Sequence, residues 1–363
     1  MNPDVVIILT AALVAVAGSL LGVFLVLRRQ SMMSDAISHS VLPGIVGAFW
    51  ISGGSATLPA LVGAAMVGLL TVGSVQLLER SGRLKADAAI GVVFPLLFSV
   101  GVILVSLYFR DVHLDLDAVL YGEIAYAPLN TLVLGGREVP ESLLLMGGLA
   151  ALNFIFVTAL FKELKVSTFD PGLAATLGFV PAALHYALMT LLSFTTVGAF
   201  QSVGAVLIVA FVIIPPACAF LLTQRLAVML WLSAGIGVLA SAAGYGLALW
   251  LNSSIAGMIA TVLGVIFVAC VLFSPLQGLV ATQQRRSRQR QEFSARLLLT
   301  ALHEQTLAPT VSELASRLEW TPALVGPALA HALRAGWLVE RSGRFELTEQ
   351  GRLIQHASFR DVS

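Results

Sequence analysis

Charged residues are scarce in this chain of 363 residues, at 11% of the total, whereas soluble proteins carry roughly 25%. Hydrophobic residues make up 58%, and apolar runs recur from the N-terminus to about residue 274. Several of these runs reach the roughly 18 residues that a helix needs to cross a bilayer. The composition therefore excludes an ordinary soluble protein over most of the chain and predicts an all-α polytopic membrane protein.

Cysteine is nearly absent, since the chain has only Cys218 and Cys270, both inside apolar runs. A disulfide framework is therefore not expected. The phosphate-binding pattern G-x-x-x-x-G-K-[ST] occurs nowhere, so an ATPase serving this protein must be another chain. No catalytic constellation is visible, and we expect neither hydrolysis by this chain nor a permanently bound cofactor. No cationic residue precedes the first apolar run, which favours a retained helix over a cleaved signal peptide.

Hydropathy and length predict about nine transmembrane helices. They cover residues 4–27, 32–52, 57–78, 87–108, 142–161, 180–199, 203–222, 227–251 and 255–273. Basic residues gather in alternate loops on one side, which by the positive-inside rule is the cytoplasm. This places the N-terminus outside and the C-terminus in the cytoplasm. Gly18 and Gly22 predict close helix packing, and Pro215-Pro216 predicts a broken or kinked helix within the seventh span.

Two ionisable residues lie inside the second predicted span. Asp35 and His39 are four residues apart, so both face the same side of a helix, one turn from each other. Ionisable groups within a membrane cost about 2.5 to 3.5 kcal/mol on insertion scales and therefore pair or line a pathway. Carboxylate and imidazole together suit a divalent transition metal. The pair indicates a metal path, and an Asp–His bond that fixes a helix interface is the structural alternative.

A short helix with explicit end signals is predicted in the loop between the fifth and sixth spans. Asp170 suits the N-cap, Pro171 the first helical position, and Gly178 the position just past the end. This element is either a rigid contact for a cytoplasmic partner or an ordinary interfacial helix. His185, near the start of the sixth span, is a secondary candidate for a functional role.

The chain after the last span has the composition of a soluble domain. A basic segment (283–291) leads into predicted helices at 295–304, 310–318 and 321–334, followed by a hairpin around Ser342-Gly343. The predicted domains are a transmembrane domain (1–280), a basic linker (281–293) and a cytoplasmic domain (294–363).

Three segments resemble the permease subunits of the ABC-3 family, which import manganese, zinc or iron. The first is LVLRRQSMMSDAISHSVLPG at 25–44, the second is Phe169-Asp170-Pro171 with Ala174 and Gly178, and the third is VGAVLIVAFVIIPPA at 203–217. A weaker match, DAVLYGE at 117–123, is similar to an outer-loop segment of the family. The resemblance covers roughly residues 5 to 275.

The resemblance implies a role for each of these residues and a set of partners. Asp35 and His39 would line the metal path, and the 169–178 segment, with Phe169, Asp170, Pro171, Ala174 and Gly178, would couple to the ATPase. The partners implied are cytoplasmic ABC ATPase subunits, an extracytoplasmic metal-binding protein, and a second permease subunit in a homodimer or heterodimer.

The C-terminal domain is similar to the winged helix-turn-helix part of iron-dependent repressors. Residues 291–363 nevertheless carry seven arginines against eight acidic residues, and DNA binding depends on phosphate neutralisation. We therefore favour a protein-contact or regulatory module, and nucleic acid is not an expected partner. The alternative function is a membrane-anchored, metal-responsive transcriptional regulator. A proton-coupled secondary transporter is disfavoured because no further buried carboxylates appear.

Overall fold

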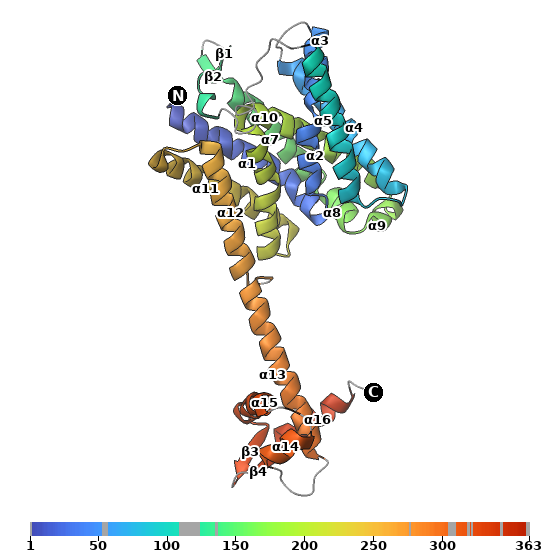
Figure 1. The fold of residues 1–363 in the computed structure, drawn as a ribbon, viewed down its shortest axis with the longest axis vertical. Helices are drawn as coiled ribbons and strands as arrows, with labels where there is room; N and C mark the ends of the chain where they lie inside the picture. The colour runs from blue at the N-terminus through green and yellow to red at the C-terminus, as the bar shows by residue number, and fades with distance from the viewer. Residues whose placement is uncertain are drawn as a thin grey trace. The chain divides into compact units, whose positions relative to one another are not determined.

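The computed structural model describes residues 2–52, 57–108, 124–134, 137–275, 277–303, 310–317, 320, 322–341 and 344–360. The chain divides into two compact units, Met1–Leu272 and Phe273–Ser363 (Figure 1). The predicted outer-loop segment 117–123 and the hairpin turn Ser342-Gly343 lie outside the described residues.

The first unit is a bundle of helices with one small hairpin. Its elements are α1 (Pro3–Leu27), α2 (Met32–Ser40), α3 (Leu42–Ser52), α4 (Thr57–Arg80), α5 (Ala86–Tyr108), the 3-10 turn η1 (Ile124–Tyr126), β1 (Thr131–Leu134), β2 (Arg137–Pro140), α7 (Glu141–Ala159), α8 (Phe161–Phe169), α9 (Pro171–Thr176), α10 (Pro181–Leu222), α11 (Leu226–Leu251) and α12 (Ile255–Phe273). Helix α1 is central, because it packs against α7, α10 and α11. Strands β1 and β2 pair antiparallel.

Eight stretches of helix among the described residues are long and apolar enough to cross a membrane. The predicted second span differs, because α2 ends at Ser40 and α3 begins at Leu42. Pro43 explains the division, since it has no N–H to donate to the carbonyl of His39 and its ring crowds that carbonyl. The predicted span over 32–52 is thus present as two helices that meet at Val41, and neither is long enough to cross a membrane by itself.

The sixth and seventh predicted spans form a single long element, α10, with a break inside it. The break lies at Gly204 (φ 81°, ψ 167°) and not at Pro215-Pro216, through which α10 continues. A positive φ of this size is open to glycine at little cost. The predicted end of the sixth span at 199 and start of the seventh at 203 therefore lie next to the observed break. At Pro215-Pro216, where a broken or kinked helix was also expected, α10 continues without a break.

The second unit is a smaller helical domain with a two-stranded hairpin. It consists of α13 (Leu279–His303), α14 (Val311–Arg317), α15 (Pro322–Arg334), β3 (Leu338–Arg341), β4 (Arg344–Leu347) and α16 (Glu349–Arg360). Leu298, Leu299, Leu329 and Phe345 are among the buried residues of its core. Helix α13 begins before the basic segment, so the predicted linker at 281–293 is helical, as its glutamines and arginines favour. The sequence did not predict α16.

Candidate metal path and coupling surface

A tight reversal of the chain sets α2 beside the end of α1. Arg29 adopts φ 58°, and the Gln30 amide donates to the carbonyl of Leu25 at 2.9 Å. Helix α2 then packs against α4, α5 and α10. The short turn therefore carries the chain directly from α1 into the helix that bears Asp35 and His39.

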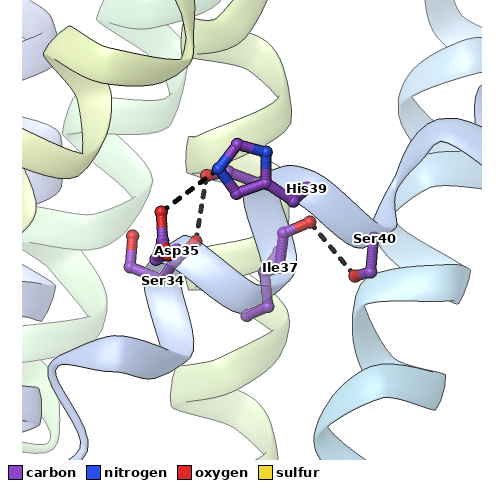
Figure 2. A network of polar contacts seen from close by, with 6 residues as sticks. Ser34, Asp35, Ile37, His39 and Ser40 are labelled. Atoms are coloured by element: carbon purple, nitrogen blue, oxygen red, sulfur yellow. Dashed lines mark hydrogen bonds and ion pairs between the residues drawn. The ribbon is translucent and has the colours of Figure 1, made fainter. Parts of the chain in front are cut away.

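The structure brings Asp35 and His39 together as the sequence spacing predicts (Figure 2). The Nε2 of His39 lies 3.3 Å from Oδ1 of Asp35, and the two side chains are 38% and 35% exposed. Neighbours on the same helix, Met33, Ala36 and Ile37, are buried. The pair therefore occupies the open face of α2, where a cation or a second protein chain has access to both donors.

A polar contact next to His39 joins α2 to α4. The hydroxyls of Ser40 and Thr71 lie 2.6 Å apart. Within α2, Ser38 donates to the carbonyl of Ser34 at 2.9 Å. With the buried residues Met33, Ala36 and Ile37, the contact to α4 gives the backbone under Asp35 and His39 a defined position.

The pair is an incomplete ligand set within one chain. Among the residues that the structure describes, no group of three or more His, Cys, Asp or Glu side chains could hold a metal ion. Two donors bind a transition metal weakly, and additional ligands would have to come from water or from another subunit. Weak, incomplete coordination suits an ion that must enter and leave.

The predicted capped helix is present as α9. The Asp170 side chain accepts from the Leu173 amide at 2.9 Å, and Pro171 is the first helical residue. Gly178 has φ +86°, and the Phe179 amide closes the end by donating to the carbonyl of Ala174 at 3.0 Å. Ala174 is buried, so α9 is held against the bundle.

An apolar surface surrounds α9. Phe169, Leu173, Leu177 and Val180 are each at least half exposed, and we call these four residues the α9 surface. Only Phe169 was among the predicted site residues, although the spacing of four from Phe169 to Leu173 to Leu177 was a usable signal. Exposed apolar patches of this kind mark contacts with other proteins or with lipid.

His113, Asp115 and Asp117 follow the fourth predicted span. From the sequence they could meet metal or a delivery protein, and a solvated acidic loop is the simpler interpretation; they lie outside the described residues. His185 is present at the start of α10, where its Nδ1 lies 3.1 Å from the guanidinium of Arg28. It takes no part in the Asp35–His39 pair.

Residues 5–274 match the ABC 3 transport family. The chain belongs to this family. It is 47% identical over 287 residues to the manganese transport system membrane protein MntD of Bacillus subtilis, which covers 79% of this chain and 97% of the relative. It is 44% identical over 364 residues to the zinc transport system membrane protein TroD of Treponema pallidum, covering 98% and 99% of the two chains. The structure of PsaBC from Streptococcus pneumoniae in complex with Fab superposes with a TM-score of 0.64 at 30% identity, over 76% of this chain and 94% of that chain.

Family membership makes this chain a permease subunit of an ABC transporter, and ATP hydrolysis belongs to a separate chain. The two relatives also differ in an informative way. The Treponema protein aligns with 98% of this chain. The Bacillus protein aligns over 97% of its own length, but with only 79% of this chain. The second unit therefore lies largely outside the part of the chain that aligns with the Bacillus relative.

Proposed function

We propose that this permease imports a divalent transition metal (manganese, iron or zinc) across the cytoplasmic membrane, along a path lined by Asp35 and His39. The observation that carries the proposal is the pairing of these two donors on the open face of α2. Carboxylate and imidazole accept all three metals. Relatives named for manganese, zinc and chelated iron transport support the substrate class.

Three kinds of partner complete the proposed importer. Cytoplasmic ABC ATPase subunits would dock on the α9 surface, and an extracytoplasmic metal-binding protein would deliver the ion. A second permease subunit would bring another Asp–His pair or its counterpart to the path. Two incomplete pairs from two subunits would then supply four donors, which is enough for a transition metal with no further protein ligand.

The proposed orientation has the N-terminus outside and the C-terminus in the cytoplasm. Arg28, Arg80 and Arg225 lie at helix ends on the side that carries α9 by chain order, and Lys165 lies in α8, the short helix that leads into α9. Cytoplasmic loops are enriched in lysine and arginine. The docking of ATPase subunits on α9 requires the same side to be cytoplasmic.

For the second unit we propose a winged-helix fold that serves in protein contact or regulation. The order of three helices, a hairpin and a further helix supports the fold. In the recognition position, the exposed residues of α15 include Gly326, Pro327 and Ala330, which have no side-chain donors for base edges; its basic residues, the half-buried His331 and the exposed Arg334, are confined to the last turn. With the balanced charge of this region, this favours a protein partner over duplex DNA and weighs against the regulator alternative.

The test is metal accumulation by a deletion strain that carries Asp35→Asn or His39→Ala. Loss of a group that merely orients a metal ligand typically costs about 10–100-fold in affinity, so loss of a ligand should reduce uptake by at least about tenfold. The matched control is Asp87→Asn, an exposed carboxylate in the first turn of α5. Whole-cell elemental analysis reports the uptake and names the metal, and immunoblots of membranes report the amount of protein. Normal accumulation by both α2 variants would refute the path.

A further inference from the structure

One side chain links three separate helices at the end of α1. The guanidinium of Arg28 donates from Nε to the hydroxyl of Thr168 at 3.2 Å and from Nη2 to the hydroxyl of Ser167 at 3.2 Å. Its Nη1 lies 3.1 Å from Nδ1 of His185. Ser167 and Thr168 are on α8 and His185 is on α10, so Arg28 uses all three of its nitrogens to hold two other elements.

The partners of Arg28 flank the coupling helix on both sides. Ser167 and Thr168 immediately precede the 169–178 segment, and His185 follows it in the first turns of α10. On its own chain, Arg28 is separated from α2 by only residues 29–31. Arg28 is thus a short polar connection between the two ends of the coupling segment and the helix that carries Asp35 and His39.

The hydrogen bonds of the Arg28 guanidinium depend on the positions of α8 and α10, which carry its three partners. Among the described residues, no carboxylate is within ion-pair distance of Arg28, so only neutral groups accept its hydrogen bonds. Burial of the guanidinium lowers the pKa of Arg28. A half-buried cation without a counter-ion is costly unless its hydrogen bonds are made. A displacement of α8 or α10 that broke these bonds would therefore force Arg28 to move with its partners.

The same region holds two buried polar atoms that have no partner among the residues that the structure describes. Because a guanidinium only donates, Nδ1 of His185 must accept, and the proton of the neutral imidazole lies on Nε2. That Nε2 is buried without an acceptor, and Oε1 of Gln30 is buried without a donor. Gln30 and His185 line the same hollow, of about 370 Å³. A donor and an acceptor thus line the same hollow beside the hydrogen bonds of Arg28, and neither is tied to a protein partner that would resist a shift of α8 or α10.

We propose that Arg28 is a positioning residue that transmits movement of the coupling segment to α2, so that ATP-driven displacement of α9 changes the geometry of the Asp35–His39 pair. This inference depends on the proposed function. It assigns Arg28 no contact with the metal and none with the ATPase.

The test compares metal transported per ATP hydrolysed by the transporter reconstituted with its ATPase in liposomes, using Mn²⁺ and Zn²⁺ as probes. Arg28→Gln should bind the ATPase and hydrolyse ATP, but the metal moved per ATP should fall about fivefold or more, the lower range of measured couplings between sites. The control is Arg29→Gln, which removes the same charge from the adjacent, exposed residue and should keep the normal ratio. A merely structural role would lower transport and hydrolysis together and leave their ratio unchanged.

A second variant covers the case in which Arg28→Gln does not assemble. Ser167→Ala combined with Thr168→Val removes both hydroxyl acceptors of α8 while keeping the cation, and it should lower the same ratio. A normal ratio in that double variant, or in an assembled Arg28→Gln, overturns the inference. If the unmodified transporter moves neither Mn²⁺ nor Zn²⁺, nor Fe²⁺ tested in the same way, the proposed function fails instead.

Discussion

Gly22 illustrates how a single residue sets the distance between two helices. A Cβ on Gly22 would lie on the carbonyl oxygen of Val212 in α10, and 2.9 Å from the ring of Pro216. That carbonyl is the one that Pro216, with no N–H, leaves without its helical donor. The Cα–H of Gly22 points at the same oxygen, an arrangement that weak C–H···O bonds stabilise modestly. The glycine therefore lets α1 approach α10 and complements the proline.

The first prediction concerns Gly22→Ala. The added methyl group has no space, so the helices must separate, at a cost of about 1–3 kcal/mol typical of overpacking. Gly73→Ala in α4 is the matched control, because a Cβ there meets nothing within 4 Å and should cause no loss. Thermal unfolding of the detergent-solubilised protein measures both. Equal melting temperatures for the two variants would contradict this role of Gly22.

At the scale of elements, α9 depends on its cap. The helix has only 6 residues, so its own hydrogen bonds are too few to hold it in water. The Asp170 carboxylate satisfies one free amide at its start, and Gly178 allows the chain to leave in the left-handed conformation. The apolar side chains of the α9 surface keep a fixed orientation as long as α9 is formed, and they lose it when the helix unfolds.

The second prediction is that Asp170→Ala weakens the association with the ATPase while Asp170→Asn largely preserves it. Loss of an N-cap costs about 1 kcal/mol, and asparagine caps as well as aspartate does. Hydrogen exchange of the 171–176 amides should be faster in the alanine variant only. Copurification of the ATPase reports the consequence. Equal loss of association in both variants would show that the charge of Asp170, rather than its capping bond, is what the ATPase recognises.

At the scale of the whole molecule, the first compact unit matches the family and the second lies outside that match. The match to the ABC 3 transport family ends at residue 274, close to the boundary between the units at Leu272 and Phe273. The core of the second unit is built from its own residues, such as Leu298 and Phe345. The Bacillus relative aligns over 97% of its length with 79% of this chain, so a member of the family exists with little sequence beyond the permease unit.

The third prediction follows for a chain that ends at Gly278, before α13 begins. It should reach the membrane and restore metal content to a deletion strain as the full chain does under metal limitation. The difference should appear in regulation, as altered accumulation when the metal is in excess. Elemental analysis across a range of external metal concentrations measures both. If truncation abolishes uptake while His39→Ala leaves it intact, the second unit carries the function and the regulator alternative gains support.

Much of the permease was predictable because its signals are local. Long apolar runs fix the membrane helices, a spacing of four brings Asp35 beside His39, and the cap and C-terminal glycine of α9 act within one or two turns. The sequence also gave the resemblance that identified the family. The division between the sixth and seventh spans was predicted at 200–202, next to the break at Gly204. The prolines at 215 and 216 do not interrupt α10, because neighbouring groups in a membrane protein can satisfy the backbone atoms that a proline leaves free.

The remaining features were decided by contacts between residues far apart in the chain. Arg28 meets Ser167, Thr168 and His185 at separations of 139, 140 and 157 residues, and Gly22 meets Val212 across two helices. Which face of α2 stays open likewise depends on α4, α5 and α10 packing on the other side. Local sequence patterns determine which helices form and where they begin. Only the packing of the bundle determines which side chains meet, because the period of a helix shows which of its faces is buried and carries no information about the distant residue that packs against it.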